Sequence, residues 1–279
     1  MYKKFYIAAV FLFLSFELFA VPFSVIREAG TAKNYPDADY LVIFDSTYVD
    51  VQESGLSYRT YHQLYKVLTP EGAKKLNHLN YRYDPLSANV EIKKVKIYRK
   101  EGKVEELDMQ KEEIDYPAPA RMIYWGARHK MVNIGELEPG DAVEVVRKMK
   151  GFTYALLQDE NPPDESRYVP PMEGHFYDIV EFWNDQPVKR KVYKLKLPRS
   201  KELYHEFYNG KIYSSKYNIK GGRLYTFAKC NIGPVDKEPH MVAVSDVAPK
   251  LILTTTKKWE QKSLWFYNVN KDYGSFEYN

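Results

Sequence analysis

The chain has 279 residues, of which 44% are hydrophobic, so it can bury one or two sizeable cores. Its formal net charge of +4 is spread along the sequence with acids between the bases, which gives no support to nucleic-acid binding. The single cysteine excludes an intrachain disulfide and a cysteine-based zinc framework.

The N-terminus has the pattern of a secretory signal peptide. Two lysines precede an apolar run that starts at Phe5 and ends near the small residue Ala20, where a peptidase could cut. This run is short for a membrane span, and Glu17 interrupts it. We therefore expect residues 1–20 to be removed as the protein is exported to the periplasm or cell surface. A retained N-terminal anchor is the alternative.

Short β-rich segments separated by turns dominate the chain from Tyr40 to Cys230. Alternation of apolar and polar residues predicts strands over residues 40–51, 56–68, 89–100, 141–150, 175–183 and 188–197. In the third of these, the alternation changes phase after Ile92. One extra residue at Lys93–Lys94 would produce that change, which predicts a β-bulge.

Turn residues predict three hairpins and one short helix. The pairs Glu101-Gly102, Asn209-Gly210 and Gly221-Gly222 tolerate positive φ and lie between alternating runs. Thr69 is suited to cap a helix, and Pro70 to occupy its first position. We therefore predict a helix or helical turn near residues 69–78.

These elements predict an all-β fold class. A first β unit covers residues 38–158, and a second covers 175–248. The Pro-rich residues 159–174 form a loop or linker between them. The two units either share one sandwich or form two domains, and the sequence leaves both open.

The last segment, residues 250–279, is predicted to be a linker followed by the start of an amphipathic helix. Thr256 can cap that helix, and Glu260 in its first turn would suit the helix dipole.

Cys230, His240 and Asp246 have the order of a thiol catalytic triad. A nucleophilic cysteine needs a stabilised thiolate and an imidazole within hydrogen-bond reach. Here all three residues fall on a predicted strand and its following loop, and free cysteines are commonly buried as small hydrophobic residues. We therefore favour a structural cysteine and keep a thiol enzyme using Cys230 as a hypothesis.

The other titratable residues indicate neither a metal site nor a cofactor. None of the six histidines forms the close pair that is typical of a metal site. The sequence also has no glycine-rich phosphate loop and no nucleophile elbow. We expect no bound metal and no cofactor.

Aromatic residues are abundant, with 25 Tyr, 14 Phe and 4 Trp. Exposed aromatic rings can bind sugars or peptides, although tyrosine also suits half-buried sheet surfaces. The segment "RMIYWGARHKM" contains Tyr124, Trp125 and Arg128 and is the best candidate for an exposed binding loop.

Three segments resemble a family of unknown function, the β-rich domain that precedes the transglutaminase-like catalytic domain in many exported bacterial proteins. They are "YRTYHQLYKVLTPEGAKKL", "VNIGELEPGDAVEVVRKMK" and "EPHMVAVSDVAPKLILTTTKKWEQKSLWF". The second, whose turn Leu137–Asp141 leads into a strand, is more specific than the first. The resemblance covers residues 38–268 and implies a large antiparallel β-sandwich.

The resemblance also implies a function. The helix around Trp259 is similar to the first helix of a transglutaminase-like domain, whose catalytic Cys, His and Asp would lie beyond Asn279. We therefore expect a non-catalytic module whose partner is a downstream transglutaminase-like domain or an envelope protein or glycan. Its expected contact residues are Tyr124, Trp125, Arg128, Trp259 and Trp265. The alternative is a stand-alone glycan- or peptide-binding module.

Overall fold

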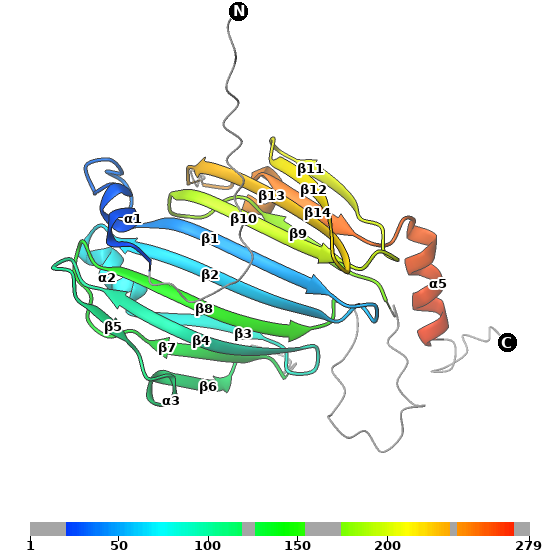
Figure 1. Cartoon of the computed structure of the whole chain (residues 1–279), viewed down its shortest axis with the longest axis horizontal. Coiled ribbons are helices and arrows are strands. Elements are labelled where there is room, and N and C mark those ends of the chain that lie inside the picture. The colour runs from blue at the N-terminus through cyan, green and yellow to red at the C-terminus, as the bar shows by residue number, and fades with distance from the viewer. Residues whose placement is uncertain (1–20, 119–125, 154–173, 235–238, 271–279) are drawn as a thin grey trace, which may run out of the picture.

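The computed structural model describes residues 21–118, 126–153, 174–234 and 239–270 (Figure 1). Strands make up 50% of the described residues and helices 13%, which confirms the all-β prediction. The strands form one large sheet and two small ones. Tyr124 and Trp125 lie outside the described residues.

The large sheet has eight strands. Their order is β12 (Tyr213–Ile219), β13 (Gly222–Ile232), β10 (Val188–Leu197), β1 (Tyr40–Val51), β2 (Ser57–Val67), β8 (Ala142–Gly151), β4 (Ala88–Tyr98) and β5 (Val104–Glu106). Neighbouring strands are antiparallel, except that β1 and β10 pair in parallel. Strands from both sides of residues 159–174 therefore belong to the same sheet.

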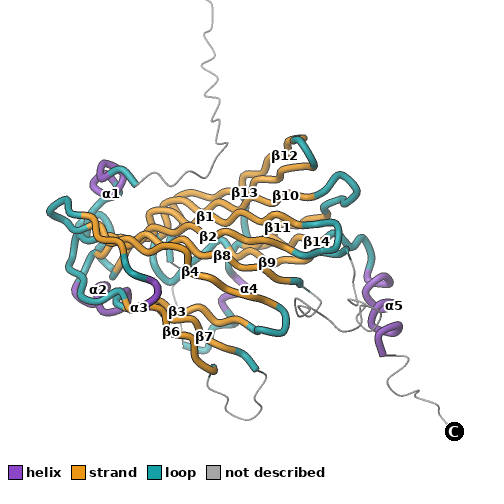
Figure 2. Tube along the Cα trace, turned by 60° about the horizontal axis from the view of Figure 1, so that its bottom comes forward, coloured by secondary structure: helices purple, strands orange, loops and turns teal. Residues whose placement is uncertain are grey.

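The two small sheets each have three strands. One consists of β11 (Tyr204–Tyr208), β14 (Lys250–Thr254) and β9 (Tyr177–Glu181), and the other of β3 (His78–Tyr83), β7 (Arg128–Asn133) and β6 (Glu113–Pro117). Both cover the same face of the large sheet, which we call the inner face (Figure 2).

The inner face carries two hydrophobic cores. Val42 of β1 belongs to the core beneath β9 and β14, whereas Val143 of β8 belongs to the core beneath β3 and β7. Tyr65 pairs in register with both of these residues, so all three side chains point to the same face. Tyr65 packs against both cores and joins them.

Five helices are described, and most are short. They are α1 (Phe23–Glu28), α2 (Pro70–Leu76), α3 (Met109–Glu112), α4 (Val244–Val247) and α5 (Trp259–Asn270). Ile26 of α1 packs with Leu41 and Leu64 on the outer face of the large sheet. Among the described residues, no helix is long and apolar enough to cross a membrane.

Several local predictions are confirmed. The pairing register between β4 and β8 shifts between Ile92 and Lys94, where the bulge was expected. Thr69 caps α2, since its hydroxyl accepts a hydrogen bond from the Gly72 amide at 3.1 Å. Two of the three predicted hairpins are present. One joins β4 to β5 at Gly102, and the other joins β12 to β13 at Gly221.

The predicted hairpin at Asn209-Gly210 is wrong. Asn209 does adopt a positive φ of 57°, but β11 pairs with β14 in a small sheet while β12 pairs with β13 in the large one. Nδ2 of the Asn209 side chain donates to the carbonyl of Ala248 at 3.2 Å, which fixes the chain where it crosses between sheets. Positive φ tolerance indicates a turn, but it does not say which strands pair.

The predicted cap of the last helix is also wrong. α5 begins at Trp259, and the Thr256 hydroxyl lies 3.2 Å from Nδ1 of His175 instead of capping the helix. Oε1 of Gln261 accepts from the amides of Lys257 and Lys258 at 2.9 and 3.2 Å. A side chain inside the first turn therefore satisfies the free amides, as in one half of a capping box.

Candidate functional site

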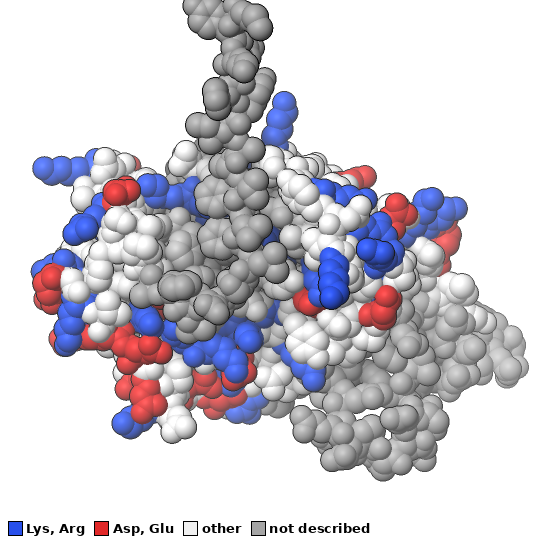
Figure 3. Space-filling model, in the orientation of Figure 1, with Lys and Arg blue, Asp and Glu red and all other residues white. Residues whose placement is uncertain are grey.

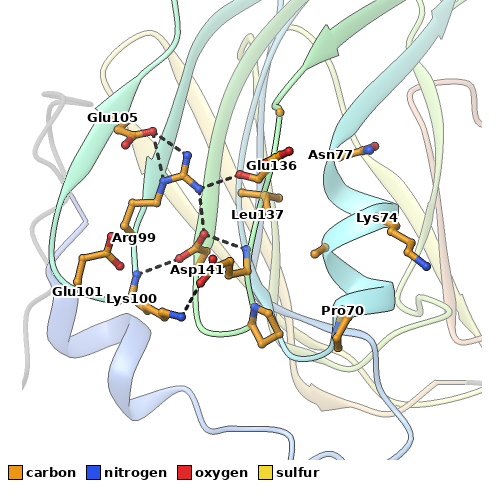
Figure 4. A pocket seen from close by; sticks show the side chains of 14 residues that line it. Pro70, Lys74, Asn77, Arg99, Lys100, Glu101, Glu105, Glu136, Leu137 and Asp141 are labelled. Atoms are coloured by element: carbon orange, nitrogen blue, oxygen red, sulfur yellow. Dashed lines mark hydrogen bonds and ion pairs between the residues drawn. The ribbon is translucent and has the colours of Figure 1, made fainter.

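Two of the family-like segments meet at one end of the large sheet, around an open groove of about 1050 Å³ (Figure 4). One wall is α2, and the other is the turn Leu137–Asp141. The Gly140 amide donates to the Val67 carbonyl at 3.0 Å, and the Val67 amide donates to the Asp141 carbonyl at 2.9 Å. These bonds hold the turn beside the end of β2, which leads into α2.

Asp141 organises this groove. Its carboxylate accepts from Nη1 of Arg99 at 3.0 Å, from the Lys100 amide at 3.0 Å and from the Glu138 amide at 3.1 Å. The side chain is buried, so these donors replace water. Asp141 therefore closes the turn and locks it to β4, which is a structural role.

Arg99 extends the network to the rim of the groove (Figure 4). Its Nη2 atom donates to Glu105 at 2.8 Å. Hydrogen bonds from Arg99 and Lys103 lower the pKa of Glu105 to about 2. Lys100 likewise pairs with Glu138. Glu101 and Glu136 also line the groove, and their carboxylates form no ion pair with another described residue. The charges that hold the turn are therefore paired, whereas two carboxylates at the rim are not.

Basic and acidic side chains are also intermixed on the surface seen in Figure 3. Within the described residues, no group of His, Cys, Asp and Glu is placed to hold a metal ion.

Helix α5 is the most exposed apolar element. It extends away from the sheets (Figure 1). Trp259, Leu264, Phe266 and Tyr267 are 60–74% exposed. At about 100° per residue, these four side chains spread over roughly half of the helix circumference, and Trp265 faces the remaining side. The helix is therefore apolar on most sides and lacks the single stripe expected of an amphipathic helix.

The predicted contact residues have different environments. Trp259 is strongly exposed, but Trp265 is only partly exposed and packs edge-on against Phe266. Arg128 begins β7 and donates to Asp115 at 2.7 Å, so its charge is already paired. The sequence analysis missed Phe266 and Tyr267, although helical spacing from Trp259 could have placed Phe266 on the same side.

The three residues with catalytic order do not form a triad. No hydrogen bond between described residues joins Cys230, His240 and Asp246, and His240 has a positive φ of 63° in an exposed loop. The expectation of a buried cysteine is also wrong, because Cys230 is exposed. It lies near the end of β13, opposite Arg190 of β10 in the pairing register.

We expect iodoacetamide to alkylate Cys230 completely in the native protein, at the rate found in the unfolded chain. Exposure without a base makes the thiol accessible but not activated. Mass spectrometry of timed samples would measure both rates, with Cys230→Ser as the unreactive control. Much faster alkylation of the native protein would indicate an activated thiolate and would revive the thiol-enzyme hypothesis.

Comparisons with known proteins identify a family and a fold. Residues 53–235 match the family model described as "Domain of Unknown Function with solved-structure structure (DUF3857)". A search of curated proteins found no match.

Among solved structures, the chain is similar to "a putative protease" from Parabacteroides distasonis, with 12% identity and a TM-score of 0.64. The match covers 85% of this chain and 47% of that one, so the chain spans about half of that protein. An M1 zinc metallopeptidase from Deinococcus radiodurans matches with 11% identity and a TM-score of 0.37, over 78% of this chain and 42% of the other.

Proposed function

Because this chain belongs to the DUF3857 family, a family of unknown function, we propose that it is the non-catalytic N-terminal module of an exported transglutaminase-like protein. In this role it positions the catalytic domain or presents protein substrates to it. The proposal rests on the family and on the segments that resemble domains of this kind. Export and removal of residues 1–20 are part of the proposal.

The exposure of α5 carries the proposal. A water-exposed helix with four large apolar side chains is unfavourable unless another surface covers it, because each side chain gains roughly 1.5–3 kcal/mol when it is buried. The helix also follows directly on β14, which is fixed in a small sheet. A domain that continued from α5 would cover these side chains and would be held close to the β module.

The similar structure from Parabacteroides distasonis supports the same proposal. That protein is about twice as long as the region it shares with this chain, and it is described as a putative protease. A β module joined to a catalytic half would have this organisation. The likeness in fold supports the proposed arrangement, while the proposed chemistry rests on the resemblance in sequence.

The size of the natural product tests the proposal. We expect an immunoblot of the source cells to show a product much larger than 32.8 kDa, and mass spectrometry to find peptides that continue past Asn279. A product that ends at Asn279 would contradict the proposal.

A pair of variants of that longer product tests the role of α5. Phe266→Ser should expose the junction to limited proteolysis, because it removes an apolar contact with the downstream domain. Leu86→Ser is the matched control, since Leu86 is 55% exposed in a loop far from α5 in sequence. Equal proteolysis of the two variants would show that α5 is not covered.

One observation favours a second candidate, a glycan-binding module. Tyr213 and Tyr217 are 63% and 59% exposed on β12, at the edge of the large sheet. Residues four apart on a strand point to the same side, so the two rings form an exposed aromatic pair. Glycan binding that is lost in Tyr213→Ala would support this candidate over the first.

A further inference from the structure

A line of polar side chains crosses the inner face between the two hydrophobic cores. It runs through Tyr193 of β10, Asp178 of β9, Arg59 and Tyr61 of β2, Arg147 of β8 and Tyr81 of β3, and we call it the polar seam. Arg147 lies directly opposite Tyr61 in the β2–β8 register. The seam therefore reaches from one small sheet, across the large sheet, to the other small sheet.

One half of the seam contains an ion pair. Nη1 of Arg59 donates to Oδ2 of Asp178 at 2.8 Å, and the Tyr193 hydroxyl donates to the same oxygen at 2.6 Å. Burial opposes the charge on Arg59, but Asp178 and the neighbouring tyrosines raise the pKa of Arg59 further above its usual range. This half is a partly buried ion pair that needs no ligand.

The other half has a cation but no anion. The Arg147 guanidinium lies 3.5 Å from the ring centroid of Tyr61 and 4.7 Å from that of Tyr81. Within the described residues, no carboxylate pairs with it. The nearby Asp45 carboxylate is instead engaged by Lys191 at 3.0 Å and by Gln63 at 3.2 Å.

Buried donors without partners gather in this same half. Nε of Arg147 and the hydroxyl of Tyr81 are buried and have no hydrogen-bond partner among the described residues. In the other half of the seam, Nε of Arg59 is also buried without such a partner. Burial raises the pKa of Tyr81 to about 12, although the charge of Arg147 opposes this, so the phenol keeps its proton and can donate. Buried donors left unpaired are costly, and a folded protein retains few of them.

The chemistry of these donors specifies the ligand. A guanidinium held flat against an aromatic ring presents its N–H groups in a fixed fork, which matches the two oxygens of a carboxylate. Asp45 and Asp178 nearby make a doubly charged phosphate a poorer ligand than a singly charged carboxylate. Arg147 and Tyr81 are each partly exposed as residues. Because Nε of Arg147 and the Tyr81 hydroxyl are themselves buried, a carboxylate would reach these two donors only after a shift of the side chains.

We propose that Arg147 and Tyr81 form a binding site for a carboxylate group of a polypeptide, with Tyr61 holding the guanidinium in place. The group is either an acidic side chain or a chain terminus. This site would give the module its own contact with a peptide. The proposal is independent of whether a catalytic domain follows Asn279.

Three blocked peptides test the site on the purified chain, by titrations followed through the backbone amide resonances in NMR spectra, a readout that the variants below also give. Ac-Ala-Glu-Ala-NH2 carries a side-chain carboxylate, Ac-Ala-Gln-Ala-NH2 carries none, and Ac-Ala-Ala-Ala-OH carries a terminal one. We expect at least one carboxylate peptide to bind about tenfold more tightly than the glutamine peptide. The peptide that binds identifies the source of the group. Equal binding of all three, or none, would overturn the proposal.

Variants separate a binding arginine from a structural one. Arg147→Met should weaken carboxylate binding about tenfold, and Tyr81→Phe about fivefold, because each removes a donor. Arg147→Met should leave the midpoint of thermal unfolding nearly unchanged, because no carboxylate among the described residues would lose an ion-pair partner. The control is Arg82→Met, which changes an exposed arginine on the opposite face of β3. The proposal fails if Arg147→Met binds like the unaltered chain.

Discussion

Replacing Gly72 by alanine should destabilise the protein by about 3 kcal/mol, although alanine is the better helix former. A Cβ atom at this position would lie 1.9 Å from the carbonyl oxygen of Asp39 and 2.6 Å from its carbon. Both are backbone atoms. The same oxygen accepts from the amides of Leu68 and Thr69 at 3.0 and 3.1 Å, so it is held in place.

The helix would have to move away from β1 to admit the new methyl group. Ala73 and Leu76 of α2 are buried in the core beneath β3 and β7, so this movement would open that core. Helix propensity favours alanine over glycine by only about 1 kcal/mol, whereas overpacking costs about 1–3 kcal/mol and occasionally more. The clash should therefore dominate.

Urea denaturation would measure the change in the free energy of unfolding. Gly233→Ala is the control, because no atom lies within 4 Å of the Cβ it would add, and it should stay within about 0.5 kcal/mol. If Gly72→Ala were as stable as the unaltered chain, α2 would not pack on Asp39 as closely as the structure has it.

Two long strands of the large sheet were predictable from the sequence. β1 coincides with its predicted range of residues 40–51, and β10 with 188–197, because each is rich in β-branched and aromatic residues and alternates over part of its length. The strands β3 (His78–Tyr83) and β6 (Glu113–Pro117) escaped prediction. They are short and polar, so their sequence pattern does not distinguish them from the loops on either side.

Strand partners could not be predicted by the same means. The parallel pairing of β1 with β10 joins Val42 to Val188 across most of the chain, and no local signal marks such a pair. The sequence pattern does, however, indicate the face of the sheet on which Arg147 lies. With Val143 and Val145 pointing inward, period two places Arg147 on the inner face as well. The partners of Arg147, which are Tyr61 and Tyr81, lie on other strands, so this pattern does not reveal them.

Replacing Glu144 by glutamine should also destabilise the protein, by about 3–5 kcal/mol, because it leaves a buried lysine without its counter-charge. Glu144 is buried on the outer face of β8. Its Oε1 lies 2.7 Å from Nε2 of His62 and 3.1 Å from Nζ of Lys94, and its Oε2 accepts from the Tyr98 hydroxyl at 2.8 Å. Glutamine would face these donors with an NH2 group that donates as well.

The same carboxylate should make stability depend on acid pH. Burial works against its ionisation, but hydrogen bonds from His62, Tyr98 and Lys94 outweigh burial and lower the pKa of Glu144 from 4.5 to about 2. A lowered pKa in the folded state gives stability that is complete above the unfolded pKa and is lost as the pH falls. The loss should run from about pH 4.5 to pH 2 and reach roughly 3 kcal/mol.

Urea denaturation at several pH values would separate this carboxylate from the others. The unaltered chain should lose stability between pH 4.5 and pH 2 more steeply than Glu144→Gln does, because the variant has no proton to gain at this site. Glu106→Gln is the control. The Glu106 side chain is largely exposed, so its ion pair with Lys96 at 3.2 Å should contribute less than about 1 kcal/mol. Parallel pH profiles for the unaltered chain and Glu144→Gln would mean that Glu144 titrates alike in the folded and unfolded states. The hydrogen bonds from three donors would then not be present in solution.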